Sequence, residues 1–498
     1  GLRIYVFEPD GSLRPGFPVR NDPAFCRPDD EHQPNDHRKC GFLATPAVGH
    51  LEGADKPLDI VASSVDGHLY VLRGDGSNLF APVDLVDPNA STKVHAESIN
   101  DPAIGDLNGD GRDDVVVATN ETYDPDPAGG DLSLSGVLGS AGQSARVYAV
   151  SGNDGSFLPG WPIHINGLIQ DTLPLIGPGN DAAIASIGGA PTVFASATSG
   201  SLSTYAGDGT RERTMRQEAV GPASDATDRS GGLNLFESAS VGDLLGAGQL
   251  AAVKYELSVG GLANLAAVGQ NVPYNHLIGA FDARTGAPLP AWPTVTDDFQ
   301  FLSASTIAKV APSNPTNQVL AQNGLGMLHA YDGASGQDVP GFPKVTGGWL
   351  FAPTALSDDG RMAAITREGY LFEWRSGAAA CQTEWPEFRH DPHSTGNYDA
   401  DGTPPDAPEQ LSARALGGGS FQVSFVSPGD DRRCGTAKEY VASADGQPVD
   451  LGAPVAGGQT FTATVSLPAG ARILTVAARD DAGNLGAPAS VSLGKTRR

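Results

Sequence analysis

A short proline-rich motif recurs in this chain and limits the folds open to it. Pro-Gly-Phe-Pro occurs at residues 15–18 and 340–343, Pro-Gly-Trp-Pro at 159–162 and Pro-Ala-Trp-Pro at 290–293. Glu-Trp-Pro-Glu-Phe at 384–388 reads as a terminal variant. Each proline lacks a backbone N–H, so a strand containing two of them cannot lie in the middle of a sheet. We therefore expect each copy to form the outer edge strand of a small sheet.

Strands of alternating apolar residues precede the motif and repeat with it. They occupy residues 4–7, 69–72, 147–150, 278–281, 328–331 and 371–374, within units that begin near residues 43, 97, 167, 231, 299 and 349. A period of about 50 residues is typical of propellers and solenoids. The predicted fold class is all-β, with a β-propeller over residues 1–400 whose aromatic residues pack between blades.

An incomplete repeat precedes these six. Residues 2–19 contain only an outer pair of strands, at residues 2–7 and 13–19. Natural proteins rarely leave a strand edge exposed. We therefore expect about seven blades, the first of them partial. Its inner pair would come from a preceding segment or from another subunit.

The segment between residues 106 and 114 has the chemistry of a metal-binding loop. Asp106, Asn108 and Asp110 place a side-chain oxygen at every second position, and a glycine turn follows. The carbonyl of Arg112 and the carboxylate of Asp114 could complete a ring of oxygens, which suits the six to eight oxygen ligands of Ca²⁺. An ordinary hairpin rich in Asp and Asn is the alternative. A β-branched strand follows at once, so the loop is unlike an EF-hand.

Residues 103–117, Ala-Ile-Gly-Asp-Leu-Asn-Gly-Asp-Gly-Arg-Asp-Asp-Val-Val-Val, resemble the calcium repeat of FG-GAP β-propellers, as in integrin α-subunits and many secreted bacterial proteins. The resemblance implies that this loop joins the first two strands of a blade and binds Ca²⁺ structurally. The equivalent loops at residues 50–55, 243–248 and 357–360 lack enough alternating oxygens. We expect one calcium site.

The chain contains four cysteines, Cys26, Cys40, Cys381 and Cys434. An even number in an acidic chain favours disulfides and a secreted protein. Proximity favours Cys26–Cys40, which leaves Cys381–Cys434. A zinc site formed by Cys26, Cys40, His32 and His37 is the alternative.

Composition excludes some partners. The net charge of −26 argues against nucleic acid and anionic membrane, since phosphate binding needs a basic surface. No apolar run approaches the length of a transmembrane helix.

The pattern changes after residue 400. Residues 401–408 include Thr-Pro-Pro-Asp-Ala-Pro, which predicts a stiff linker. Residues 409–498 contain alternating strands at 421–425, 439–441, 461–466 and 474–479 and resemble a fibronectin type III domain, with Phe425 at the usual place of a core tryptophan. This predicts a small β-sandwich.

Sequence motifs of enzymes are lacking: there is no nucleophile elbow, zinc-protease helix, phosphate loop or dinucleotide fingerprint. His390 and His393 follow the last unit, where we expect them to cap the propeller edge. The hypothesis is a secreted or cell-surface, calcium-stabilised, non-catalytic binding or adhesion module that takes a protein or carbohydrate ligand. The alternatives are the C-terminal region of a larger secreted hydrolase, such as a subtilisin-type protease, or a propeller-type polysaccharide lyase.

Overall fold

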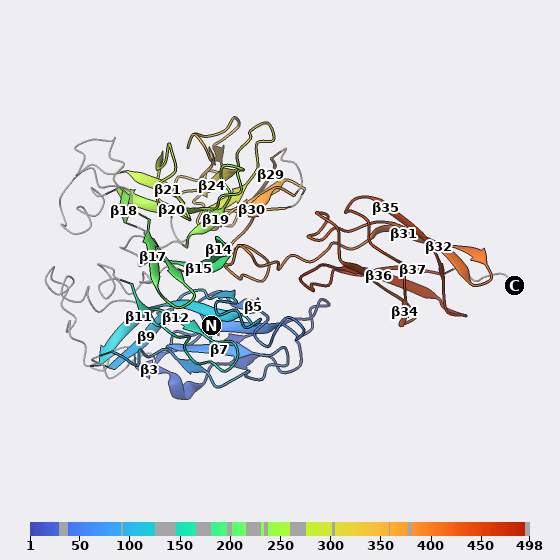
Figure 1. Ribbon diagram of the computed structural model, residues 1–498, viewed down its shortest axis with the longest axis horizontal. Helices are drawn as coiled ribbons and strands as arrows, with labels where there is room; N and C mark the ends of the chain where they lie inside the picture. The colour runs from blue at the N-terminus through green and yellow to red at the C-terminus, as the bar shows by residue number, and fades with distance from the viewer. Residues whose placement is uncertain are drawn as a thin grey trace. The chain divides into compact units, whose positions relative to one another are not determined.

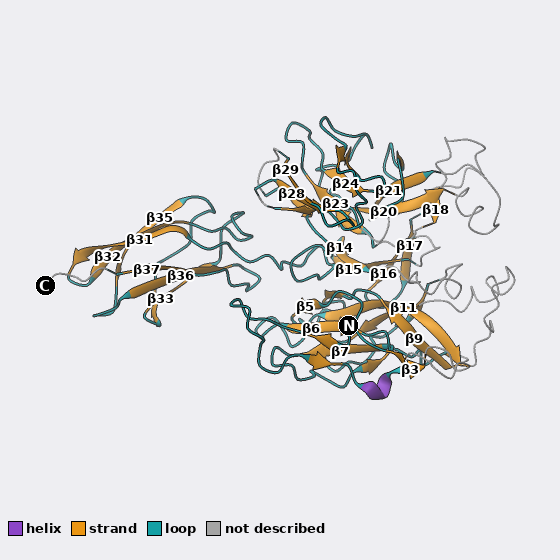
Figure 2. Cartoon of the chain, turned by 180° about the vertical axis from the view of Figure 1, so that it is seen from behind, coloured by secondary structure: helices purple, strands orange, loops and turns teal. Residues whose placement is uncertain are grey.

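The computed structural model describes residues 1–28, 38–90, 93–124, 146–165, 181–196, 202–215, 231–233, 238–258, 275–300, 304–357, 359–376 and 381–493. Within these ranges the only helical element is a short 3-10 turn, η1 (Pro23–Phe25), and all other regular structure is β (Figure 2). The chain divides into two compact units. The first contains Gly1–Leu356, Arg361–Gly377 and Thr383–Ala400, and the second contains Ser357–Gly360, Ala378–Gln382 and Asp401–Arg498.

Small antiparallel sheets made of consecutive strands form the first unit (Figure 1). We name them blades A to F. Blade A has β5 (Ala47–Gly49), β6 (Asp59–Ser63), β7 (His68–Leu72) and β8 (Val83–Asp84); blade B has β10 (Ala103–Gly105), β11 (Asp114–Asp124), β12 (Arg146–Val150) and β13 (Ile163–His164); blade C has β14 (Ala183–Ile187), β15 (Ala190–Ala195), β16 (Ser203–Ala206) and β17 (Arg211–Thr214). Blade D has β19 (Ser240–Gly242), β20 (Ala251–Ser258), β21 (His276–Asp282) and β22 (Thr294–Thr296); blade E has β23 (Thr306–Ala308), β24 (Gln318–Gln322), β25 (Met327–Asp332) and β26 (Lys344–Val345); blade F has β27 (Ala355–Leu356), β28 (Arg361–Ile365) and β29 (Leu371–Arg375). In addition, β9 (Lys93–Ile99) pairs with β11, and β18 (Gly231–Leu233) pairs with β20.

The blades bury their apolar residues against their neighbours in chain order. Val71 of blade A packs in one cluster with Val115 and Tyr148 of blade B. Other clusters join blade B to blade C, blades C, D and E to one another, and blade E to blade F. Face-to-face packing of successive four-stranded sheets is the architecture of a β-propeller. Aromatic residues such as Tyr148 therefore have the packing role that the sequence predicted, whereas Tyr5 and Phe7 of the first predicted strand are exposed.

The recurring motif precedes the outer strands of blades B, D and E and the strand β2 (Val19–Arg20), and does not itself form the outer strand as the sequence predicted. The strands β2, β13, β22 and β26 each begin directly after the second proline of a copy. The peptide bond before that proline is cis in all four copies. Since the prolines precede the ladder rather than sit in it, they cost the sheet no hydrogen bond.

Contacts with the next blade explain the middle of the motif. In blade B, the indole Nε1 of Trp161 donates to the carbonyl of Gly207 in blade C, at 2.8 Å. Gly160 has a positive φ of 86°, and a Cβ there would lie 1.8 Å from the carbonyl oxygen of Asp208. Trp292 of blade D repeats the pattern, donating to Gly333 of blade E at 2.9 Å. The motif is thus a connector that fixes one blade on the next.

The first unit begins with a hairpin, as the sequence predicted. Here β1 (Arg3–Ile4) pairs with β2, and Phe7 bridges to Leu13. One face of the hairpin packs on blade A, where Ile4 is buried. No other strand of the described residues pairs with β1, so the source of an inner pair stays a prediction.

The prediction for residues 384–388 was wrong. There β30 (Thr383–Trp385) pairs with β23, the first strand of blade E, instead of forming an outer strand. No further blade follows to receive the aromatic side chain, and Trp385 is buried in the cluster shared by blades C, D and E. The Trp-Pro pair at 385–386 therefore lies at the end of an inner strand and not before an outer one.

The residues after β30 run along the first strands of the blades, and we call residues 383–399 the central segment. The backbone N–H of Val48 in blade A donates to His393, and that of Ile104 in blade B donates to Thr395. In blade C, Ile184 bridges to Asn397. In blade F, Leu356 donates to Pro386. His390 and His393 accordingly lie beside inner strands and do not cap an outer edge.

The second unit is a two-layered β-sandwich (Figure 1). One sheet has the order β31 (Glu409–Gly417), β32 (Ser420–Val426) and β35 (Thr460–Ser466). The other has the order β34 (Gln447–Val449), β33 (Glu439–Ala444), β36 (Ile473–Arg479) and β37 (Ala489–Ser492). Phe425, Tyr440 and Phe461 form the aromatic centre of the core between the sheets, with ring centroids 4.8–5.0 Å apart.

Two disulfides join the four cysteines, Cys26 to Cys40 and Cys381 to Cys434. Both cysteines of the zinc alternative are thereby used, while His32 and His37 lie outside the described residues. The expected linker, residues 401–408, belongs to the second unit, where Pro405 bridges to Arg432.

Candidate metal-binding loop

The predicted metal ligands lie in the turn between β10 and β11, the first two strands of blade B. Gly109 and Gly111 have positive φ values of 77° and 82°, which let the chain fold back on itself within a few residues. Leu107 is buried beneath the turn. The turn thus has an apolar anchor below and polar side chains above.

The side-chain oxygens of the turn are turned inward toward its own backbone. Asp106 accepts from the N–H groups of Gly109 and Gly111, at 2.7 and 2.9 Å. Asn108 Oδ1 accepts from Asp110 N at 2.9 Å, and Asp110 Oδ1 accepts from Arg112 N at 3.0 Å. These bonds hold the side chains at the alternate positions around one tight loop.

Asp114 closes the loop from the first position of β11. It is fully buried, and its carboxylate accepts from Leu107 N at 3.1 Å and Gly152 N at 3.3 Å. Burial raises the pKa of Asp114 to about 6, and the charges of Asp110 and Asp106 act in the same direction against the two hydrogen bonds. A buried carboxylate that repels its neighbours is stabilised by a cation.

Asp113 does not belong to this group. Its Oδ2 accepts from the backbone N–H of His50 in blade A, at 2.6 Å. Burial raises its pKa, and the bond from His50 opposes the shift. Of the two consecutive aspartates, one joins blade B to blade A and the other faces the loop.

The residues of the loop fit a calcium ion in type. They offer Asp106, Asp110 and Asp114 carboxylates, the Asn108 amide and a main-chain carbonyl at Arg112, all oxygen donors. The three carboxylates do not converge within 4.8 Å of one another; among the described residues, such a group of acidic side chains occurs at Asp401, Asp430 and Asp481. The loop is therefore a ring of mixed oxygens rather than a carboxylate cluster.

The equivalent loop of blade D has the same shape with fewer oxygens. Asp243 accepts from Ala247 N at 3.2 Å and Gly248 N at 2.6 Å, as Asp106 does in blade B. Leu244 is buried at the place of Leu107. The next alternate position is Leu245, which brings no oxygen. The first aspartate and the leucine thus maintain the turn, and the additional acids are particular to blade B.

A buried charged group in the central segment was missed by the sequence analysis. Arg389 donates to the carbonyls of Ala182 at 2.7 Å and Pro102 at 2.9 Å. Asp181 Oδ1 accepts from Asp101 N at 2.8 Å. Burial and the charge of Asp181 raise the pKa of Asp101 to about 7, against the effect of Arg389. No local sequence signal marks these three residues, since they come from parts of the chain far apart.

Comparison with known proteins agrees with the fold. Residues 54–117 match the FG-GAP-like repeat family, and this stretch contains β10, the loop and the first four residues of β11. No curated protein matches the chain. No helix in the described ranges has the length and apolar character needed to cross a membrane.

The similar solved structures are distant. BamB from Moraxella catarrhalis is 13% identical over 69% of this chain and 88% of its own, with a TM-score of 0.33. BBS1N in complex with ARL6DN is 13% identical over 68% of this chain and 79% of its own, with a TM-score of 0.36. The Dos1 propeller is 9% identical over 75% of this chain and 81% of its own, with a TM-score of 0.34.

Proposed function

We propose that this chain is a secreted, calcium-stabilised binding or adhesion module that has no catalytic centre of its own. The oxygen-lined turn of blade B carries the proposal, because its ligand types and its buried, repelling Asp114 suit Ca²⁺ and a structural role. Asp106, Asn108, Asp110, the Arg112 carbonyl and Asp114 would hold the ion. The ion would fix the β10–β11 turn against the rest of blade B.

The C-terminal unit supports the module interpretation. It has three strands in one layer and four in the other, and we propose that it is the fibronectin type III-like sandwich that the sequence resemblance implies. Phe425 lies in the hydrophobic core of the sandwich, which supports this proposal. Such sandwiches act as spacers or as binding surfaces beside a larger domain.

Two disulfides support an extracellular location, since disulfides persist in oxidising compartments. The acidic surface implied by a net charge of −26 favours ligands other than nucleic acid. We propose a protein or a carbohydrate as the ligand.

A binding screen tests the proposal. The immobilised chain is exposed to a glycan array and to extracellular proteins, in calcium and in excess EGTA. Saturable binding of one glycan or protein, weaker in EGTA, is the expected result. Cleavage of a polysaccharide or a peptide by the purified chain would contradict the non-catalytic assignment.

A further inference from the structure

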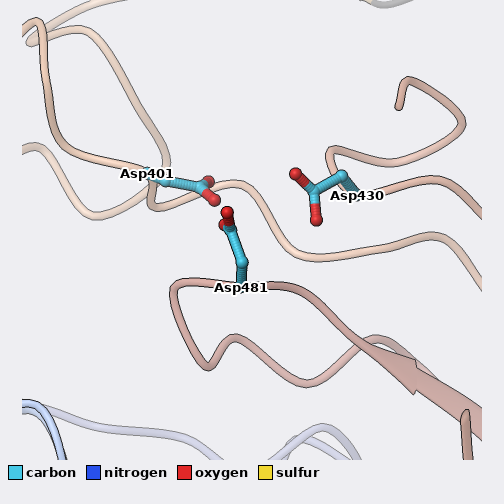
Figure 3. A group of neighbouring side chains, drawn as sticks. All are labelled: Asp401, Asp430 and Asp481. Carbon is cyan, nitrogen blue, oxygen red and sulfur yellow. The ribbon is translucent and has the colours of Figure 1, made fainter. Parts of the chain in front are cut away.

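The second unit contains a group of acidic side chains at one end of the sandwich, formed by Asp401, Asp430 and Asp481, and Asp480 precedes Asp481 in the chain. We call this group the acidic cluster. Oxygens of Asp401, Asp430 and Asp481 lie within 4.8 Å of one another, and Figure 3 shows these carboxylates facing a common space. They come from three separate segments: the start of the unit, the β32–β33 loop and the turn after β36.

Hydrogen bonds between these segments hold the cluster together. The turn after β36 is fixed to the start of the unit by Asn484, whose Nδ2 donates to the carbonyl of Asp401 at 2.8 Å. The β32–β33 loop is fixed to the same stretch, since Asp406 N donates to the carbonyl of Arg432 at 3.0 Å. The aspartates are therefore brought together by the fold of this unit.

A buried carboxylate oxygen without a hydrogen-bond partner is an independent sign of a missing ligand. Asp480 is fully buried, and its Oδ1 accepts from Asn484 N at 2.6 Å. Its Oδ2 is buried and has no partner among the described residues. Leaving a buried carboxylate oxygen unpaired is costly, because the desolvation of a charged group is not offset. Asp430 Oδ1, also buried, has no partner either.

The four side chains act on one another as like charges. Burial raises the pKa of Asp480, and the charge of Asp401 adds to the shift. Burial likewise raises the pKa of Asp430, with Asp481 as the next cause. No lysine or arginine is among the main causes for either carboxyl. The nearby Arg433 pairs instead with Asp406 and Glu409.

We propose that the acidic cluster binds a calcium ion, separately from the loop of blade B. All the ligand atoms of the cluster are oxygens, whereas structural zinc sites favour cysteine sulfur and histidine nitrogen. The nearby Cys434 cannot serve as a thiolate ligand, because it is held in a disulfide. The cluster spans three loops, so its geometry can adjust to the irregular coordination of Ca²⁺ more easily than to the strict octahedron of Mg²⁺. The ion would cross-link the start of the unit to the two loops and bring the unpaired oxygens a partner.

Equilibrium dialysis against calcium, with the full chain, tests the proposal. Asp481→Asn is the main variant, because the side chain is exposed and its change removes a ligand without burying a new group. We expect Asp481→Asn to weaken one calcium site at least tenfold, and Asp401→Asn combined with it to abolish that site. Asp450→Asn, at an exposed aspartate of the same unit outside the cluster, is the matched control and should bind like the parent.

A second variant, Asp110→Asn, distinguishes calcium binding at the loop of blade B from calcium binding at the cluster. In Asp110→Asn the cluster should still bind its ion, and adding Asp481→Asn in that background should weaken this binding at least tenfold. An unchanged number of bound ions and unchanged affinities in the Asp401→Asn, Asp481→Asn double variant would overturn the proposal, whatever the loop of blade B binds.

Stability without calcium gives an independent measurement. Removing one of several repelling charges should leave the melting temperature in EGTA unchanged or higher. Asp481→Asn should lose most of the calcium-induced stabilisation of the second unit, while that of the propeller remains. A lower melting temperature in EGTA, with the calcium response retained, would mean that Asp481 has a structural role and would also overturn the proposal.

Discussion

Gly160 shows how one residue fixes the contact between two blades. Its φ of 86° is costly for any side chain, and its Cα lies against the backbone of Asp208 in the next blade. Gly188 in the β14–β15 turn has a similar φ of 66°, but a Cβ there would meet nothing within 4 Å. Comparing alanine substitutions at Gly160 and Gly188 therefore separates the cost of a positive φ from the cost of the clash with the next blade.

We predict that Gly160→Ala destabilises the propeller more than Gly188→Ala. Both substitutions place a Cβ at positive φ, which costs about 1–2 kcal/mol. Only Gly160→Ala also forces the blades apart, at a further cost of about 1–3 kcal/mol. Urea unfolding of the two variants measures the difference. Equal losses would show that the motif does not hold the blades together.

Asp59 at the start of β6 makes stability depend on pH. It is buried with Oδ2 unpaired, and burial, followed by the charge of Glu52, raises its pKa from 3.8 to about 6. In this range the folded protein binds a proton that the unfolded chain has released. The stabilisation that protonated Asp59 gives the folded state is fully present below about pH 4 and is lost as the pH rises through about 6.

We predict that Asp59→Asn flattens this dependence, because the amide stays neutral at every pH. The free energy of unfolding of the parent chain in EGTA should fall more steeply between pH 4 and pH 6 than that of the variant. Parallel curves for parent and variant would show that Asp59 does not titrate in that range.

The central segment is the element that ties the blades together. It hydrogen-bonds to the first strands of blades A, B, C and F and adds a strand to blade E. Arg389 fixes its middle through the carbonyls of Pro102 and Ala182. Burial raises the pKa values of Asp101 and Asp181, and the positive charge of the nearby Arg389 guanidinium opposes that rise.

We predict that Arg389→Met costs about 3–5 kcal/mol of stability, since it leaves buried carboxyls without their counter-ion. Adding Asp181→Asn should recover part of the loss, because it removes one of those charges. Denaturant unfolding of the two single variants and the double variant measures the coupling. Strictly additive losses would exclude an electrostatic role for Arg389.

The repeating sequence pattern made the blades predictable, but the central segment could not be predicted, because its contacts are far apart in the sequence. The strands before each motif, the edge position of β13 and β26, and the β-sandwich all follow from local patterns. The central segment does not, because Asn397 meets Ile104 and Ile184 across long stretches of chain. The prediction of an outer strand at residues 384–388 was wrong for the same reason. A local pattern does not show whether another blade follows for the aromatic side chain to pack against.

The candidate metal loop was predictable by residue type, since alternating oxygens and a glycine stand together in the sequence. The acidic cluster of the second unit was not. Asp401, Asp430 and Asp481 are separated in sequence and come together only through the folded loops. Asp114 was predictable as a ligand, but its complete burial became apparent only in the fold.

At the scale of the whole molecule, a β-propeller and a small sandwich share one chain, and we propose that calcium stabilises the propeller. The blades pack in sequence order, the connectors join blade B to blade C and blade D to blade E, and the central segment hydrogen-bonds to the inner strands. Calcium in blade B would add a local restraint to one of these sheets. Binding to the folded state alone raises its stability by about 2.7 kcal/mol at a calcium concentration one hundred times Kd.

Calorimetric unfolding of the full chain in calcium and in excess EGTA tests this claim most directly, with Asp110→Asn and the exposed Asp154→Asn measured beside the parent. We predict that calcium raises the melting temperature of the propeller in the parent and in Asp154→Asn. In Asp110→Asn most of that increase should be absent. The same propeller melting temperature in calcium and EGTA for the parent chain would show that calcium does not stabilise the propeller.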